Sequence, residues 1–324
     1  AGRTKYPRFK KKSKKQSATY ARNAFTWSDG KLTLAKMKRP LKIKWSRYFE
    51  GEPKTVTISR EPSGRYFVSF LVEEKLERLP PGKGEIGIDL GVKDVLVTSK
   101  GFASGNPKYY KKYHNKLAKL QRGLAKKQKG SNNRHKARLK LAKLHAKIAD
   151  CRRDFTHKLT ARDGEVASPC QIAVLTTQLV RQNQAIYTET LAVKNMMANH
   201  KLAKAIADCN WGELLRQLEY KCQWHDRKLV GIDRWFPSSK RCHNCGHILD
   251  KLPLDIREWQ CPSCLKVNSR DINAALNILA VGQTVVACGL GNGSGCFFDS
   301  SSHSRLKQES PSFRDGECQN SVTR

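Results

Sequence analysis

The chain has no run of 18 apolar residues, which excludes a transmembrane helix of ordinary length. No apolar stretch of the kind found in secretory signal peptides opens the sequence. Acidic residues are also scarce: 28 Asp and Glu stand against 62 Lys and Arg, which gives a formal net charge of +34 over 324 residues. Such a charge destabilises a compact protein unless a polyanion neutralises it, so we expect nucleic acid as the partner.

The positive charge is concentrated in two stretches. Residues 1–60 contain 18 Lys and Arg against three Asp and Glu, and residues 107–160 contain 18 against two. The rest of the chain is close to neutral and can form ordinary globular structure. A membrane surface is the alternative polyanion, but the basic stretches lack the aromatic-rich apolar face of an interfacial helix. The distribution therefore favours nucleic acid.

The eleven cysteines do not have the pattern of a secreted disulfide framework, and a reducing intracellular compartment fits them better. Two Cys-x2-Cys pairs separated by 15 residues predict a tetrahedral four-sulfur Zn2+ site of structural type, because four thiolates leave no open position for water. Its ligands are Cys242, Cys245, Cys261 and Cys264. Other possible ligands are interpreted as surface or packing residues: His243, His247 and the pair Cys222 and His225. The cysteines without paired spacing are interpreted as ordinary thiols: Cys151, Cys170, Cys209, Cys288, Cys296 and Cys318.

The first part of the chain, over residues 20–76, is predicted to be a small β domain. Alternating apolar residues predict strands at Lys31–Leu34 and Leu41–Trp45, and a hairpin over residues 55–72 turns at residues 61–64. The Pro- and Gly-rich residues 80–84 read as a linker. Further strands are expected at residues 86–90, 95–98 and 230–232 and near residues 235–236, and a helix is expected over residues 271–281.

Residues 107–159 are predicted to form a basic helical hairpin. Leu117, Leu120 and Leu124 follow helical spacing, as do residues 141, 144 and 148, and residues 130–133 break the two arms. A solvated helix face is the alternative interpretation. The near-absence of Glu among the Lys and Arg favours contact with nucleic acid, because solvated helices ordinarily carry both signs of charge.

Three carboxylates stand at the ends of different predicted elements. Asp89 ends a strand between two glycines, Glu189 ends a second strand, and Asp271 opens a helix. Each has an ordinary structural explanation as a turn residue or a helix cap. Brought together at one edge of a sheet, they would repel one another unless divalent cations were bound. Mg2+ held there would support phosphodiester hydrolysis.

These residues resemble the TnpB (OrfB) family of insertion-sequence proteins, RNA-guided nucleases related to type V CRISPR effectors. The resemblance rests on five matching motifs over residues 1–282: residues 86–91, residues 189–197, residues 238–245 with Cys242 and Cys245, Cys261-x2-Cys264, and residues 270–275. It implies Asp89, Glu189 and Asp271 as the catalytic Mg2+-binding triad. It also implies a guide RNA and a double-stranded DNA target as partners, in the bacterial cytoplasm and at the nucleoid when DNA is bound.

The fold class that the resemblance implies is α/β. A RuvC-like, RNase H-type core would be split by the helical hairpin and a zinc ribbon, and a partial β-barrel (wedge-like) domain that holds RNA would precede it. The expected parts are the wedge-like domain (1–78), core part I (79–106), the hairpin (107–160), an atypical insertion (161–175), core part II (176–237), the zinc ribbon (238–268), core part III (269–286) and a disordered tail (287–324).

Some features depart from the family pattern. The chain begins at Ala1 and is expected to be N-terminally truncated relative to the family. About 16 residues intervene after residue 160. Ser269 and Thr190 occupy positions where Asp is common. A catalytically silent RNA- or DNA-binding protein of the same family is therefore the alternative function. A DNA-strand transposase would need a nucleophile such as Tyr109, Tyr110 or Tyr113, but no His-x-His metal site accompanies them.

Overall fold

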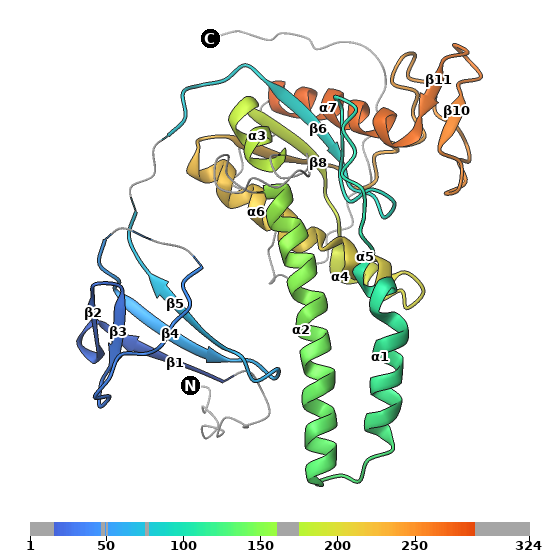
Figure 1. Ribbon diagram of the computed structural model, residues 1–324. Helices are drawn as coiled ribbons and strands as arrows, with labels where there is room; N and C mark the ends of the chain where they lie inside the picture. Colours follow the sequence, from blue (N-terminus) through green and yellow to red (C-terminus); the bar gives the residue numbers. More distant parts are fainter. Residues whose placement is uncertain (1–15, 47–48, 50, 75–77, 161–174, 289–324) are drawn as a thin grey trace, which may run out of the picture.

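The first described part of the protein is built from β strands. The structure is a computed structural model that describes residues 16–46, 49, 51–74, 78–160 and 175–288. β1, β4 and β5 form an antiparallel sheet in the order β1-β4-β5, and β2 and β3 form a separate hairpin (Figure 1). Their bounds are β1 Gln16–Ala21, β2 Phe25–Ser28, β3 Lys31–Leu34, β4 Thr55–Arg60 and β5 Tyr66–Leu71, with a 3-10 helix η1 at Arg22–Ala24. The strands predicted at residues 31–34 and 55–72 are confirmed.

The strand predicted at Leu41–Trp45 is wrong. This segment has no strand pairing, although the Leu41 N–H donates to the Leu32 carbonyl oxygen at 2.8 Å. Leu41 and Ile43 pack on the core formed with Phe25, and the ring centroids of Trp45 and Trp27 lie 5.3 Å apart. Alternating apolar residues show that one face of a segment is buried. An irregular segment that packs on a core also has one buried face, so the pattern alone does not establish a strand.

A four-stranded sheet in the order β7-β6-β8-β9 forms the centre of the molecule. β6, β8 and β9 run parallel and β7 is antiparallel to β6. The bounds are β6 Glu85–Asp89, β7 Val97–Thr98, β8 Ala185–Glu189 and β9 Lys228–Ile232. The strand expected over residues 95–98 is thus reduced to its last two residues.

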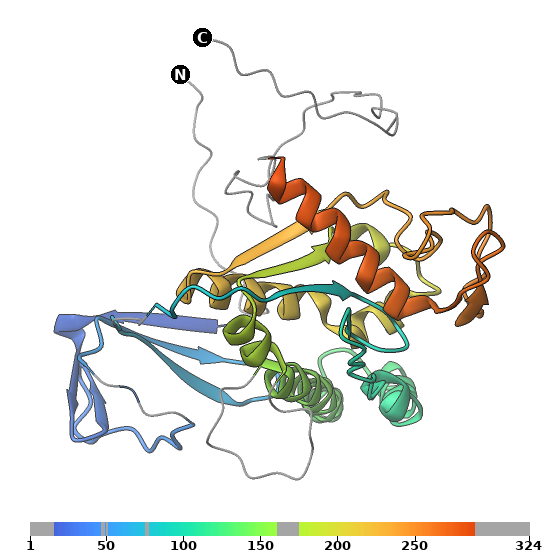
Figure 2. The ribbon, with the colours of Figure 1, turned by 90° about the horizontal axis from the view of Figure 1, so that it is seen from above.

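Helices cover both faces of this sheet (Figure 2). On one face, Ile86 and Ile88 pack with α6, which spans Trp211–Trp224, and with α3, which spans Leu175–Gln182. On the other face, Tyr187 packs against α7, which spans Arg270–Ala287. Successive strand residues point to opposite faces, so Asp89 and Glu189 share the face covered by α7.

Two glycines allow α7 to lie close on the sheet. A Cβ atom at Gly87 would stand 2.1 Å from the Ala275 carbonyl oxygen of α7, and one at Gly282 would stand 2.1 Å from the ring of Tyr187. Contacts this short are impossible for a real Cβ atom. The absence of both side chains therefore sets the distance between α7 and the strands, and so fixes where the first turn of α7 lies.

The predicted helical hairpin is confirmed. It consists of α1, Tyr109–Ala125, and α2, Asn132–Thr160, and it projects away from the central sheet (Figure 1). Its narrow core contains Leu117, Leu144 and Ile148. At its base, the Asp208 carboxylate accepts the backbone N–H of Tyr110 at 2.9 Å and pairs with the Arg152 guanidinium at 2.7 Å. This joint fixes the hairpin to α5, which spans Ala203–Cys209.

The hairpin also contacts the N-terminal sheet. The guanidinium of Arg65, the residue before β5, donates to Asp150 of α2 at 2.5 Å. The tight turn before Arg65 uses Gly64, whose φ of +84° suits glycine. The basic hairpin and the sheet are therefore neighbours, joined by a charged contact.

The remaining elements are a short ribbon before α7 and a short helix after β8. A two-stranded antiparallel ribbon of β10, Glu258–Gln260, and β11, Val267–Ser269, leads directly into α7, and α4 spans Val193–Met196. The strand region expected near residues 235–236 is wrong, because these residues form a turn in which the Phe236 N–H donates to the Asp233 carbonyl oxygen.

The predicted tail begins too early, since α7 continues to Ala287; residues 289–324, like the insertion at residues 161–174, lie outside the described residues. Within the described chain, no helix combines the length and apolar character needed to cross a membrane.

Candidate active site

Two of the three predicted carboxylates end neighbouring parallel strands. Asp89 is the last residue of β6 and Glu189 is the last residue of β8. Ile88 pairs with Thr188 in the register of the two strands, so the two carboxylates lie level at the same edge of the sheet. Both belong to the face that α7 covers. The alternation of the strands thus places two acidic groups side by side.

The third carboxylate comes from α7. Asp271 is in its first turn, and the close packing of α7 brings that turn to the strand edge. The electrostatic effects on Asp89 show that Glu189 and Asp271 are near it. Its pKa is raised well above the ordinary value, first by burial and then by the negative charges of Glu189 and Asp271, while Arg270 and Arg257 oppose this. Three acidic groups from separate parts of the sequence therefore lie close enough to interact electrostatically.

Two of these carboxylates already have polar partners. The Ser238 hydroxyl donates to Glu189 at 2.5 Å, and Arg257 pairs with Asp271 at 3.2 Å. Burial raises the pKa of Glu189, and the hydrogen bond from Ser238 opposes that increase. Within the described residues, the three carboxylates do not form a group close enough to share one metal ion; the four cysteines do.

Sequence reasoning missed the roles of Ser238 and Arg257. Ser238 precedes the first Cys-x2-Cys pair, and Arg257 precedes β10, so neither lies beside its carboxylate in the sequence. Two asparagines of α7, Asn273 and Asn277, hold the turn that carries Ser238. The side-chain amide of Asn277 donates to the Ser238 carbonyl oxygen at 2.8 Å, and both amides donate to the Arg241 carbonyl oxygen at 2.7 Å. Their helical spacing of four residues is the one signal available in advance.

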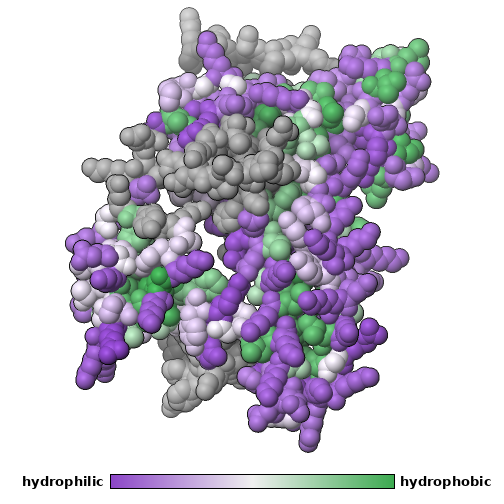
Figure 3. Space-filling view, viewed as in Figure 1, coloured by the Kyte–Doolittle hydropathy of each residue, from purple (hydrophilic) through white to green (hydrophobic). Residues whose placement is uncertain are grey.

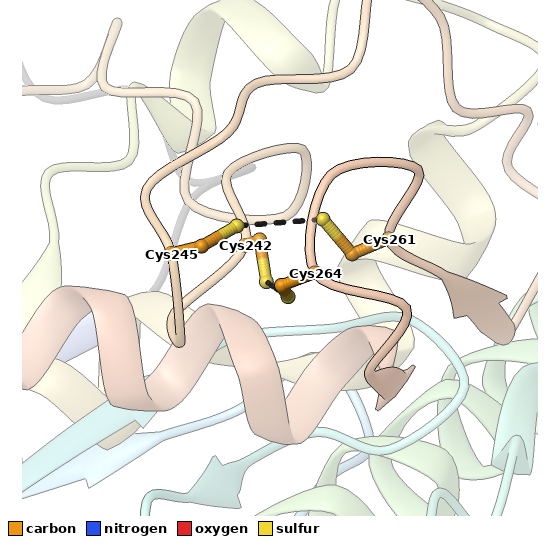
Figure 4. A group of neighbouring side chains, drawn as sticks. All are labelled: Cys242, Cys245, Cys261 and Cys264. Carbon is orange, nitrogen blue, oxygen red and sulfur yellow. Dashed lines mark hydrogen bonds between the residues drawn. The ribbon is translucent and has the colours of Figure 1, made fainter.

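The four predicted zinc ligands come together in the structure (Figure 4). The sulfur atoms of Cys242, Cys245, Cys261 and Cys264 all lie within 4.8 Å of one another. Cys242 and Cys264 are 3.7 Å apart, and Cys245 and Cys261 are 3.5 Å apart. Tetrahedral zinc with Zn–S bonds of about 2.3 Å separates its sulfurs by about 3.8 Å. The cluster therefore fits a Zn2+ ion.

Backbone amides prepare two of these thiols for metal binding. The pKa of Cys264 is lowered to about 6, chiefly by the backbone N–H of Lys266. Burial opposes ionisation of Cys242, but the backbone N–H groups of Cys245 and Asn244 lower its pKa overall. Thiolates are the form that binds zinc, so the backbone favours the binding form at these two positions. At Cys245 the backbone N–H of His247 is outweighed by desolvation and the neighbouring sulfurs, and the pKa is raised to about 11.

The alternative ligands do not join this cluster. His243 and His247 are exposed, and neither belongs to the metal-binding group. Cys222 belongs to α6 and is buried in the core, where burial raises the pKa of its thiol to about 12. Cys209 is similar, with its pKa raised to about 12 by burial and by Asp208. Cys170, Cys296 and Cys318 lie outside the described residues.

Two family models match the chain. The model OrfB_IS605, described as a probable transposase, matches residues 67–162, and the model of the Cas12f1-like TNB domain matches residues 211–278. A protein of Streptomyces pristinaespiralis named "Putative RNA-guided DNA endonuclease" is 49% identical over 294 residues, which cover 90% of this chain and 69% of that protein. The chain belongs to the TnpB (OrfB) family. The predicted resemblance is thereby confirmed.

Other relatives extend the TnpB family match. The Escherichia coli K12 protein named "Putative RNA-guided DNA endonuclease InsQ" is 31% identical over 289 residues, with 89% of this chain and 71% of that protein covered. The mimivirus TnpB-like protein L770 is 25% identical and covers 74% of this chain. A cryo-EM structure of a Cas12f1-sgRNA-target DNA complex is 16% identical with a TM-score of 0.42, and the match covers 84% of this chain and 68% of that one.

Proposed function

We propose that this TnpB-family protein is a transposon-encoded, RNA-guided DNA endonuclease with a RuvC-like, RNase H-type core. One observation carries the proposal: Asp89 and Glu189 end adjacent parallel strands on one face, and Asp271 opens the helix that covers that face. A carboxylate cluster at a strand edge is suited to holding divalent cations against a phosphodiester. The names of the relatives, RNA-guided DNA endonucleases, agree with this function.

In the proposed mechanism, Asp89, Glu189 and Asp271 would hold Mg2+. When bound, Mg2+ supplies activation of the attacking water and neutralises charge on the departing 3′ oxygen. Asp89 is buried at the strand edge, so its position is fixed by the core, whereas Asp271 lies at a helix end and would have to release Arg257 in order to bind a cation. Ser238 restrains one oxygen of Glu189 and leaves its other oxygen available.

The basic hairpin and the N-terminal β unit are the proposed surface for guide RNA and the guide–target heteroduplex. Hydrophilic side chains gather over the hairpin in Figure 3. They include exposed Lys and Arg on both arms: Lys111, Lys112, Lys116, Lys119, Arg122, Lys136, Arg138, Lys140 and Lys143. Lys and Arg side chains on such a surface bind phosphates and do not distinguish one base sequence from another. This suits a protein whose sequence specificity comes from base pairing with a guide.

The zinc ribbon has a structural role in this proposal. Four sulfurs complete the coordination of Zn2+ and leave no position for a reacting water. The ribbon strand β11 runs straight into α7, and Arg257 of the ribbon region reaches Asp271. Zinc binding thus stabilises the segment that delivers the third carboxylate to the site.

The test is recovery of RNA from the purified chain, followed by Mg2+-dependent cleavage of a DNA library that matches the bound guide. Asp89→Asn is expected to abolish cutting and to leave RNA binding nearly unchanged, and the Glu189→Ala and Asp271→Ala variants likewise. Glu85→Gln is the matched control, because Glu85 is an acidic residue at the opposite end of the same strand. Retained Mg2+-dependent cutting in a triad variant would remove that residue from the site.

A silent RNA- or DNA-binding protein is the second candidate function. The observation that favours it is the ion pair between Arg257 and Asp271, which engages one of the three carboxylates. Guided cleavage by the wild type and by Arg257→Ala, measured together, separates the two candidates. If the protein is an enzyme, the wild-type chain cuts guided DNA; if the protein is silent, neither the wild type nor Arg257→Ala cuts, while both retain bound RNA.

A further inference from the structure

A short loop begins and ends beside Glu189. Ile232, the last residue of β9, pairs with Glu189 in the sheet register, and the Thr190 hydroxyl donates to the Ile232 carbonyl oxygen at 2.8 Å. Six residues later, the Ser238 hydroxyl donates to Glu189 itself at 2.5 Å. The intervening residues 233–237 are therefore tethered at both ends to the carboxylate edge, and we call them the tethered loop.

The tethered loop is held in place from within. The Trp235 backbone N–H donates to the Asp233 carboxylate at 3.1 Å, and the Phe236 N–H donates to the Asp233 carbonyl oxygen at 3.2 Å. The Phe236 side chain packs on the core beneath α7 with Tyr187 and Ile232. One aromatic side chain of the loop thus anchors it to the core.

The side chain of Trp235, next to Phe236 in the sequence, points into solvent and not into the core. Trp235 is 78% exposed, the largest exposure among the large hydrophobic side chains of the described residues. The Arg234 guanidinium lies 4.7 Å from the centroid of its ring. An indole held on a fixed loop and left in water forgoes the free energy of burial, so a partner with a flat apolar face is the natural complement.

We propose that Trp235, together with Arg234, is a stacking platform for an unpaired nucleobase of the DNA strand whose phosphodiester lies at the carboxylate site; this inference rests on the proposed function. Tryptophan stacks on the π-face of any base, and arginine adds charge for the backbone. A guided nuclease must cut whatever sequence the guide selects, and stacking on an aromatic ring binds a base without a preference for which base it is.

The surrounding charge suits a nucleic-acid strand. Arg241 lies over the Phe236 ring at 6.0 Å, and Arg257 and Arg270 stand beside the carboxylates and oppose their negative field at Asp89. These cations flank an acidic centre that would otherwise repel phosphates. The tethered loop joins the carboxylate edge at both ends, so a strand bound at the carboxylates would lie next to the loop that carries Trp235.

The first test combines protein variants with abasic nucleotides. Guided cleavage rates are measured on a DNA substrate with one abasic nucleotide placed in turn at each position flanking the cut. In the wild type, one position is expected to lower the rate by about 5- to 150-fold, the range expected for one stacked base. Trp235→Ala lowers the rate on intact DNA by a similar factor, and the abasic nucleotide at that position then lowers it no further.

Two variants make the result specific. Trp235→Phe keeps an aromatic ring and is expected to retain most of the rate. Trp224→Ala removes another exposed tryptophan. Trp224 is 46% exposed and ends α6, just before the start of β9, whereas the tethered loop follows the end of β9. This variant is expected to cut like the wild type. Cutting by Trp235→Ala at the wild-type rate would overturn the platform and leave the proposed function standing. A full abasic effect retained in Trp235→Ala would also overturn it.

The second test does not depend on cleavage. Tryptophan fluorescence of the full chain is titrated with a single-stranded oligothymidine in the absence of Mg2+. Quenching by the single strand is expected to exceed quenching by a duplex of equal length, and the difference is expected to disappear in Trp235→Phe. Equal quenching of the wild type and Trp235→Phe would refute base stacking. A chain that shows the Trp235-dependent quenching but cuts no DNA would keep the platform and refute the nuclease.

Discussion

Glu189 shows how one side chain is tuned by two opposing effects. Its burial at the end of β8 raises the pKa of the carboxyl, and the hydrogen bond from Ser238 favours the ionised form. Only the ionised form binds a cation well. Ser238 is therefore a positioning residue that keeps a buried acid both oriented and charged, through a contact that joins β8 to the turn before the zinc ribbon.

The Ser238→Ala variant tests this role. Removal of the hydroxyl removes the effect that lowers the pKa of Glu189, so that pKa rises. The acidic limb of the pH–rate profile for Mg2+-dependent cleavage should then move to higher pH, with the largest loss of rate, about tenfold, at the acidic end. Ser239→Ala is the control and should leave the profile unchanged. An unmoved acidic limb in Ser238→Ala would contradict the assignment.

At this scale the sequence predicted the sulfur cluster that the structure brings together, and the role of the acids stays a prediction. Strand alternation and the Cys-x2-Cys spacing are local patterns, so they could be found among residues adjacent in the sequence, whereas the partners of the acids could not. Ser238 and Arg257 act on residues 49 and 14 positions away in the sequence. Such contacts depend on how separate elements pack, which single-sequence patterns do not contain.

The helix α7 links the two sites at the scale of elements. Its first turn carries Asp271, its asparagines hold the turn before the first cysteine pair, and its middle lies on the sheet through Gly87 and Gly282. Its position is thus set by the absence of two side chains. Displacing α7 would move Asp271 away from Asp89 while leaving the chain otherwise intact.

Two glycine-to-alanine substitutions, one in α7 and one in α1 as a control, test this packing. Gly282→Ala would place a Cβ atom 2.1 Å from the Tyr187 ring and should lower the free energy of unfolding by about 1–3 kcal/mol. Gly123→Ala in α1 meets nothing within 4 Å and should raise it by about 0.5–1 kcal/mol, because alanine favours helix. Denaturant titration measures both. Equal stability of the two variants would contradict the packing role.

The zinc ribbon gives a second prediction for an element. Cys242→Ser removes one of four sulfurs and should lower the zinc content below one equivalent per chain, with loss of structure in the ribbon. Cys288→Ser, at an exposed free thiol, is the control and should keep its zinc. Elemental analysis and thermal unfolding report the outcome. A folded Cys242→Ser protein with a full equivalent of zinc would refute the four-sulfur site.

Elements with strong periodicity were predictable, and weak ones were not. The hairpin α1–α2 followed from leucines at helical spacing and the break at residues 130–133. The failures, at residues 41–45 and 235–236, were short apolar segments. In the first, Leu41 and Ile43 pack on a core, and in the second Phe236 packs on a core while Trp235 is exposed; the backbone of neither segment pairs with a strand. Apolar residues in a short segment therefore did not distinguish a strand from a loop that lies on a core.

At the scale of the whole molecule, the candidate sites and much of the positive charge lie on different parts of the structure. The sheet with its helices supplies the acidic and cysteine sites, while much of the excess positive charge lies on the hairpin that projects from it. The joint formed by Asp208 and Arg152 holds the hairpin in a fixed relation to the core. A polyanion bound along the hairpin is thereby kept at a set place relative to the carboxylate edge.

Salt dependence measures that polyanion contact. Each phosphate contact adds about −0.9 to the slope of log K against log salt for duplex DNA, because bound counterions are released. The triple variant Lys116→Gln, Lys119→Gln and Arg122→Gln on α1 should weaken nonspecific duplex binding and make the slope shallower by about 2.7 if all three contact phosphates. Neutralising the same charge at Lys93, Lys100 and Lys228, which lie outside both basic stretches, should change the slope by less than one contact. Equal slopes for the two triple variants would show that net charge, and not the hairpin, holds the nucleic acid.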